Sequence, residues 1–166
     1  EYRPGHFQGV CRIVDKLLTA VQPDRLYLGQ KDYQQCMVIS KLIELEGIDT
    51  ILQVCDTVRE PDGLAMSSRN MRLNEKERVQ ALHIAKTLKY IKDNIPTVSI
   101  DDLTTAGTQY LEKEGFRVDY VAVADAENLQ VLQNWDRKRP VVVLIAAFLN
   151  EVRLIDNLVI FPPGNP

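Results

Sequence analysis

The first 55 residues alternate between helical and strand-like patterns, and this alternation limits the fold more than any other feature of the chain. Apolar residues recur at helical spacing over 6–21 and again over 32–45. Short apolar runs at 25–29 and 50–55 have the length of buried strands. Strands separated by helices pair in parallel through crossovers that are almost always right-handed. The pattern therefore predicts an α/β fold with a parallel sheet, and a further strand is expected before the first helix.

The pattern changes in the second part of the chain. The sequence NEKE at 74–77 is typical of a capping box and begins a predicted helix, and another helix is predicted from about Ser99 to Gly115. Three predicted strands follow, over 119–125, 141–148 and 152–160. Helices followed by strands indicate a separate small α+β domain. We therefore predict two domains, residues 1–62 and residues 63–166.

Composition excludes several classes of function. The formal net charge of −3 argues against a broad nucleic-acid-binding surface, which requires many Lys and Arg side chains. The longest apolar run, 141–149, is too short to span a membrane, and no signal peptide is recognised. The three cysteines lack metal-ligand spacing, so we expect buried free thiols, a cytoplasmic location and no metal site made by the protein.

The segment LGQKDYQQ at 28–35 joins a predicted strand to a predicted helix. Gly29 ends the strand, Asp32 is placed to cap the helix, and Lys31 lies between them. Ligands of parallel sheets bind beyond the carboxyl ends of the strands, where helix N-termini present free amides to anions. Lys31 would add positive charge to such a site. The alternative is an ordinary turn with a solvated lysine.

A second joint, DTVREPDGLAMSSRN at 56–70, follows the next predicted strand. Neighbouring parallel strands lie roughly 5 Å apart, so both joints could reach one triphosphate. Gly63 would give the segment hinge freedom, and we expect residues 59–70 to form a mobile lid over that ligand. The alternative is a polar loop between domains. The side chains expected to converge are Lys31, Arg59, Ser67, Ser68 and Arg69.

Four segments, RPGHFQGV, GQKDYQQ, TVREPDGLAMSSRN and RLIDN, together resemble the pantothenate synthetase (pantoate–β-alanine ligase) family. The resemblance covers nearly the whole chain. That family is similar to class I aminoacyl-tRNA synthetases and nucleotidylyltransferases. The resemblance implies that residues 1–62 form the last part of a Rossmann-like nucleotide-binding domain. Residues 63–166 would be the α+β C-terminal domain, beginning with the phosphate-binding lid.

The resemblance also implies an activity. Members of the family are AMP-forming ligases that activate pantoate with ATP to pantoyl-adenylate and then transfer the pantoyl group to β-alanine. ATP is expected as a substrate together with Mg²⁺, the natural protein as a homodimer, and its location as the cytoplasm. Two alternatives stay open: another nucleotidylyltransferase, and a non-catalytic interaction module that uses the α+β domain as a surface.

Residue roles follow from the matched motifs. The resemblance implies catalytic roles for Lys31, Ser67, Ser68 and Arg69. The implied ATP-binding residues are Gly29, Gln30, Lys31, Asp32, Val58, Met66, Ser67, Ser68 and Arg69. The implied pantoate-binding residues are Gln35, Val10, Ile13 and Val14. For the three apolar residues of this last group, core packing explains the helical spacing equally well.

Other singled-out residues are expected to be structural. We assign RLIDN at 153–157 to structure, and we expect Asn150 to occupy a turn in which the family commonly has glycine. His83 is expected to be exposed, and Trp135 to be a packing anchor.

The family's histidine motif for ATP and a further pantoate-binding glutamine are not found in these 166 residues. Because the chain opens on EYRPGHFQGV without an initiator Met, we expect it to be the second half of the enzyme and to be inactive by itself.

Overall fold

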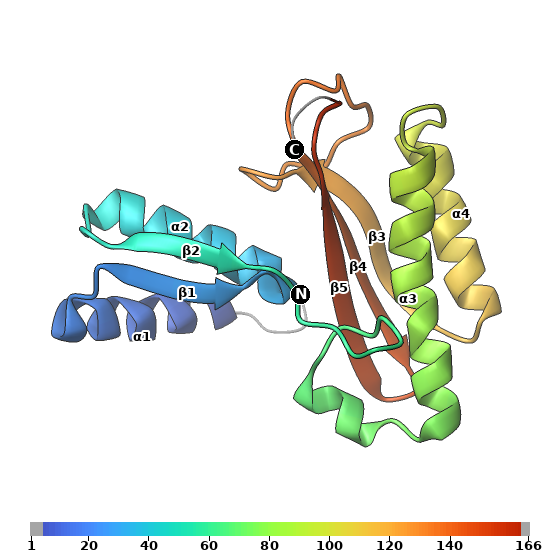
Figure 1. Cartoon of the computed structure of the whole chain (residues 1–166), viewed down its shortest axis with the longest axis horizontal. Coiled ribbons are helices and arrows are strands. Elements are labelled where there is room, and N and C mark those ends of the chain that lie inside the picture. The colour runs from blue at the N-terminus through green and yellow to red at the C-terminus, as the bar shows by residue number, and fades with distance from the viewer. Residues whose placement is uncertain (1–4, 164–166) are drawn as a thin grey trace. The chain divides into compact units, whose positions relative to one another are not determined.

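The computed structural model describes residues 5–163, so Arg3 and Pro4 of the motif RPGHFQGV lie outside the described residues. The chain divides into two compact units, Glu1–Asp56 and Thr57–Pro166, and each is described by itself (Figure 1). The two units differ in sheet type, as the change of sequence pattern predicted. The assignment of two functional domains meeting after residue 62 stays a prediction.

Unit 1 alternates helices and strands. Its elements are α1 (His6–Val21), β1 (Arg25–Gly29), the short 3₁₀ helix η1 (Gln30–Asp32), α2 (Tyr33–Glu46) and β2 (Ile51–Cys55). The strands pair in parallel, with Arg25 opposite Ile51 and Gly29 opposite Cys55. This confirms the predicted α/β fold with a parallel sheet.

The ends of the helices in unit 1 follow backbone preferences. Gly47 ends α2 in the left-handed conformation, at φ +60°, which glycine adopts without steric cost. Asp32 is the N-cap residue of α2, but its side chain makes no capping hydrogen bond, so the expected cap is corrected. The buried side chains of the helices are few: Leu18, Tyr33, Cys36 and Ile39.

Unit 2 contains two helices packed on a three-stranded antiparallel sheet with strand order β3-β4-β5 (Figure 1). Its elements are the 3₁₀ helix η2 (Ser68–Arg72), α3 (Glu75–Asn94), α4 (Ile100–Lys113), β3 (Arg117–Asp125), β4 (Val141–Leu149) and β5 (Val152–Ile160). All three strands lie where alternation and apolar runs predicted them. The core of the unit forms between α3, α4 and the central strand β4.

The predicted capping box at the start of α3 is confirmed. The Asn74 side chain accepts a hydrogen bond from the Glu77 backbone N–H at 3.0 Å, and the Asn74 N–H donates to the Glu77 carboxylate at 2.8 Å. Asn150 occupies the turn between β4 and β5 with a positive φ of 51°, as expected for the place of a glycine. Its amide donates to Glu77 Oε1 at 2.5 Å and so connects this turn to the helix start.

Two aromatic predictions have different outcomes. Trp135 packs against the core and donates its indole N–H to the Arg139 carbonyl at 2.8 Å, which confirms the packing anchor. The expectation for His83 is wrong, because its ring is mostly buried and its Nδ1 lies 2.6 Å from the hydroxyl of Tyr110 on α4.

No helix within residues 5–163 is both long enough and apolar enough to cross a membrane.

The three cysteines are free thiols, as expected, but they are not all buried. Cys36 is buried and Cys11 is half-buried, whereas Cys55 is exposed at the end of β2. The expectation of three buried thiols is therefore corrected at Cys55, since exposure alternates along β2 and Cys55 lies on the exposed face of the strand.

Candidate functional site

The first candidate region lies at the carboxyl ends of the two strands of unit 1. Gly29 and Cys55 are the last paired residues of β1 and β2, so both strands end at the same edge. Gln30 and Lys31 follow in η1 and are half-buried, and Gln35 is half-buried in the first turn of α2. A lysine and two glutamines near a helix start can bind an anion and a hydrogen-bonding substrate group.

Cys36 fixes this strand-to-helix joint from the inside. Its thiol donates to the Gly29 carbonyl at 3.5 Å. Burial, and then the nearby Asp32 carboxylate, raise the pKa of the Cys36 thiol from its ordinary value of 9.0 to about 11. A thiol with so high a pKa is a poor nucleophile at neutral pH, so its role here is structural.

The apolar residues expected beside pantoate lie on α1. Val10 and Val14 are half-buried, whereas Ile13 is exposed, as are Leu17 and Val21 on the same helix. Packing within unit 1 therefore accounts for part of the apolar spacing, at Val10 and Val14, but it does not account for the exposed Ile13. The assignment of these three residues to pantoate stays a prediction.

The second candidate region, in unit 2, is an ordered hairpin rather than an open loop. Arg59 and Ala65 form an antiparallel bridge, and the Met66 N–H donates to the Val58 carbonyl at 2.9 Å. At the tip, Gly63 has φ +95° and donates its N–H to the Glu60 carbonyl at 2.8 Å. Gly63 therefore closes a hydrogen-bonded turn in this structure, and its role as the hinge of a mobile lid stays a prediction.

The residues after the hairpin present polar side chains from a short 3₁₀ helix. The Ser67 hydroxyl accepts a hydrogen bond from the Arg69 backbone N–H at 3.2 Å and so caps η2. Met66 and Ser68 are exposed, and Arg69 is half-buried. Among residues 5–163, no carboxylate forms an ion pair with the Arg69 guanidinium. Ser68 and Arg69 can therefore bind an anion without breaking a contact of the fold.

Arg59 has a structural partner that the sequence interpretation did not anticipate. Its guanidinium binds the Asp156 carboxylate through two hydrogen bonds of 2.7 and 3.0 Å, and it also donates to the Gly63 carbonyl at 3.0 Å. The Asp156 side chain is only 5% exposed, so it requires a counter-charge. The expectation that Arg59 joins the anion-binding side chains is corrected. The structural role assigned to RLIDN has a physical reason, because Asp156 of this motif holds the hairpin through Arg59.

Three further residues of this region escaped the sequence interpretation: Glu60, Asn70 and Arg78. The Asn70 side chain is buried and donates to Glu60 Oε1 at 3.1 Å and to the Ala65 carbonyl at 3.0 Å. Arg78 forms an ion pair with the other oxygen of Glu60. A signal for Asp156 existed, because it interrupts the inward-facing apolar series of β5, and an inward charge requires a partner.

The predicted site residues therefore form two groups. Gly29, Gln30, Lys31, Asp32 and Gln35 lie at the strand edge of unit 1. Val58 and the residues of the polar turn, 66–69, lie in unit 2. The action of both groups on one ligand stays a prediction.

The residues described do not offer a metal cage. Residues 5–163 contain no cluster of three or more His, Cys, Asp or Glu side chains that could hold a metal ion.

Comparison with known proteins gives a consistent result. The family model described as pantoate-beta-alanine ligase matches residues 1–159. The pantothenate synthetase of Bacteroides thetaiotaomicron is 41% identical over 158 residues, which are 95% of this chain and 56% of that protein. The pantothenate synthetase of Thermosipho africanus is 41% identical over 160 residues, 95% of this chain and 57% of that protein.

Solved structures agree with these sequence matches. The pantothenate synthetase of Thermus thermophilus has a TM-score of 0.88 and 37% identity, covering 97% of this chain and 58% of that one. The pantoate-beta-alanine ligase of Francisella tularensis, complexed with beta-gamma ATP and beta-alanine, has a TM-score of 0.69 and 34% identity. The match covers 95% of this chain and 52% of the Francisella chain.

The chain spans somewhat more than half the length of the relatives that it matches. The expectation that the chain is a fragment is corrected in part, because the matches extend over 95% of the chain. Its inactivity by itself stays a prediction.

Proposed function

This chain belongs to the pantoate-beta-alanine ligase family, and we propose that its protein condenses pantoate with β-alanine in an ATP-dependent, AMP-forming reaction. The observation that carries this proposal is the ordered turn of residues 66–69. It presents the Ser68 hydroxyl and an Arg69 guanidinium with no carboxylate partner among residues 5–163, on a hairpin held by other side chains. A domain-connecting loop with no ligand would have no need of such a turn.

The reaction would proceed in two steps. The pantoate carboxylate attacks the α-phosphorus of ATP, the bond to the β-phosphate oxygen breaks, and pyrophosphate leaves. The β-alanine amine then attacks the acyl carbon, and AMP leaves with the electron pair of the acyl–oxygen bond. Both steps use nucleophiles of the substrates. The protein therefore contributes positioning and electrostatic stabilisation of developing negative charge.

The proposed roles divide between the two groups of residues. Lys31 offsets charge on the phosphates, with Gly29, Gln30 and Asp32 in the ATP-binding segment and Gln35 binding pantoate. Val58 lies beside the adenine, and Met66, Ser67, Ser68 and Arg69 hold the β- and γ-phosphates. Val10, Ile13 and Val14 form the apolar side of the pantoate site. The Francisella relative supports the choice of substrates, because it was solved with an ATP compound and β-alanine.

Further properties of the natural protein are proposed on the family resemblance. We assign residues 1–62 to the nucleotide-binding domain and 63–166 to the C-terminal domain. Mg²⁺ would enter with the ATP phosphates, which provide the oxygen ligands that it prefers. The natural protein would be a homodimer in the cytoplasm. Light scattering of the full-length protein tests the dimer directly.

Isotope exchange tests the proposed reaction. The full-length protein is mixed with ATP, Mg²⁺ and labelled pyrophosphate, with and without pantoate. We expect label to enter ATP only when pantoate is present, and pantothenate to form when β-alanine is added. Exchange that does not need pantoate would indicate another nucleotidylyltransferase. Absence of both exchange and ATP binding would indicate a non-catalytic module.

A further inference from the structure

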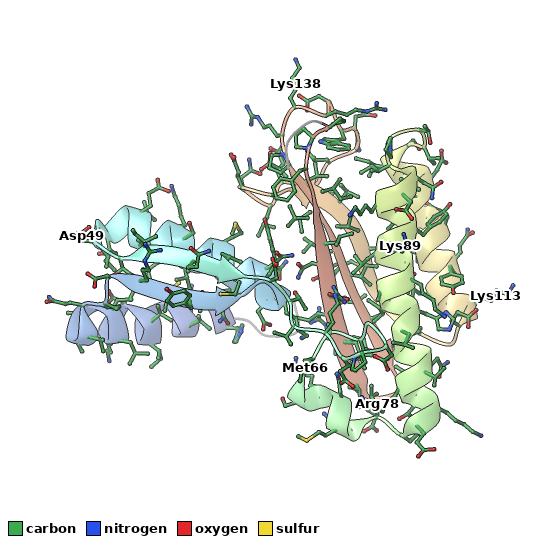
Figure 2. The ribbon with its side chains drawn as sticks, viewed as in Figure 1. Asp49, Met66, Arg78, Lys89, Lys113 and Lys138 are labelled. Carbon is green, nitrogen blue, oxygen red and sulfur yellow. The ribbon has the colours of Figure 1, made fainter. Side chains whose placement is uncertain are left out.

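The hairpin and polar turn of unit 2 are closed by three side chains that have no part in the proposed chemistry. Glu60 lies in the first limb of the hairpin and Asn70 in η2. Arg78, which Figure 2 labels, lies near the start of α3. The carboxylate of Glu60 accepts from the Asn70 amide through one oxygen and from Arg78 through the other. Arg78 also donates to the Asn70 backbone carbonyl at 3.5 Å. The three residues therefore form a closed ring.

This ring fixes both ends of the polar turn. The Asn70 amide uses its two N–H groups on Glu60 and on the Ala65 carbonyl, so it connects the positions just before and just after Met66–Arg69. Asn70 is buried, and a buried donor that loses its acceptor is destabilising because water cannot replace the lost partner. A shift of residues 66–69 relative to the hairpin would therefore break contacts that are expensive to lose.

We propose that Glu60, Asn70 and Arg78 are positioning residues that hold Met66–Arg69 in its ligand-binding shape before a nucleotide arrives. The proposal rests on the proposed function, since it concerns the same turn. None of the three side chains needs to touch the substrate, because they act through the backbone at Ala65 and Asn70. Misplacement of a catalytic group by about 1 Å can cost about 100-fold in rate, so the ring should control turnover.

The chain provides a matched control. The Arg78–Glu60 pair has side chains that are 34% and 23% exposed, and the Arg153–Asp119 pair in the same unit has side chains that are 35% and 18% exposed. Asp119 lies on β3, at the opposite edge of the sheet from β5. Glu60→Ala and Asp119→Ala each remove the acid of a similarly buried pair. Only Glu60→Ala removes a contact of the ring.

The test compares the full-length wild type with Glu60→Ala, Glu60→Gln and Asp119→Ala. Hydrogen exchange without nucleotide is measured at the amides of Met66, Arg69 and Asn70, which are hydrogen-bonded in the turn. We expect Glu60→Ala to accelerate their exchange about tenfold or more and to lower kcat of pantoate-dependent exchange by about 10- to 100-fold, leaving KM for pantoate within twofold. Glu60→Gln keeps an acceptor for Asn70 and should recover part of both effects.

Several results would overturn the proposal. Unchanged exchange of the three amides in Glu60→Ala would show that the ring does not hold the turn. Faster amide exchange with unchanged kcat would show that the shape of the turn does not matter. An equal fall of kcat in Asp119→Ala would show that the fall in Glu60→Ala comes from general destabilisation and not from the ring. A wild type without pantoate-dependent exchange would overturn the proposed function first, and with it the role of the ring.

Discussion

The two segments that carry the candidate binding groups are built in different ways. In unit 1, the joint after β1 is the three-residue 3₁₀ helix η1, whose last residue, Asp32, is the N-cap of α2 and makes no capping hydrogen bond. In unit 2, the segment at 58–70 is a hairpin bound by ion pairs to β5 and α3. Strand pairing and helix geometry set the first segment, whereas side chains distant in sequence set the second. Mutations should therefore act locally in unit 1 and at long range in unit 2.

The largest expected effect is on chemistry at the first joint. We expect Lys31→Ala in the full-length protein to lower adenylate formation about 100- to 1000-fold, because one preorganised charge contact is typically worth about 3–4 kcal/mol of barrier. The melting temperature should change little. Lys41→Ala, in the same unit, removes an exposed lysine paired with Glu44 and serves as the control. Near wild-type pyrophosphate release by Lys31→Ala would exclude the assigned role.

The ion pair between Arg59 and Asp156 tests long-range support in the second segment. Arg59→Met leaves a carboxylate that is 5% exposed without a counter-charge, and we expect the free energy of unfolding of unit 2 to fall by about 3 kcal/mol. Asp156→Ala leaves an arginine that is 30% exposed and can stay hydrated, so the loss should be nearer to about 1–2 kcal/mol. Urea unfolding measures both. Equal losses would contradict the argument from unequal burial.

A pH effect on stability is expected from Cys36 in unit 1. The pKa of Cys36 is raised from 9.0 to about 11 in the folded state, so its contribution to stability is complete below about pH 9 and is lost as pH rises through 11. At about 1.4 kcal/mol per pKa unit, the rise from 9.0 to about 11 corresponds to about 3 kcal/mol. Unfolding of wild type and Cys36→Ala is compared at pH 8 and pH 11. A difference between the two proteins that does not change with pH would contradict this prediction.

The smallest effect distinguishes two glycines, one in each segment. A Cβ added at Gly29 or at Gly63 would meet nothing within 4 Å, so only the backbone conformation differs. Gly63 has φ +95°, and Gly63→Ala should cost about 1 kcal/mol of unfolding free energy. Gly29 has φ −78°, and Gly29→Ala should be neutral or slightly stabilising. Equal melting temperatures of the two variants would show that the tip of the hairpin is not fixed.

The sequence was most informative where local patterns decide the structure. Helical and alternating spacing located the helices and strands of both units, because burial of one face sets that spacing. The capping box at Asn74 and the turn at Asn150 were also foreseen, since each depends on neighbouring residues alone. The joint at Gly29–Asp32 was foreseen as a strand end, although the aspartate side chain does not make the expected cap.

Prediction failed where a contact joins distant parts of the chain. Arg59 was expected to bind an anionic ligand, but its guanidinium instead binds Asp156, which lies on the last strand, β5. The hydrogen-bonded turn at Gly63 was also not foreseen, because a glycine in a polar segment is compatible with both an open loop and a closed turn. Glu60, Asn70 and Arg78 each look like ordinary surface residues of their local segments. Their ring exists only after tertiary packing brings the segments together.

The pairing of Arg59 with Asp156 also has a consequence for biosynthesis. The two residues are 97 positions apart in the chain. At a typical rate of 5–20 residues per second, the ribosome adds Asp156 about 5 to 20 s after Arg59. Throughout that interval the nascent hairpin lacks its carboxylate anchor, although its backbone turn is already complete. The polar turn should therefore acquire its final shape only when the last strand joins the sheet, so a nascent chain arrested before β5 would expose this segment to proteases.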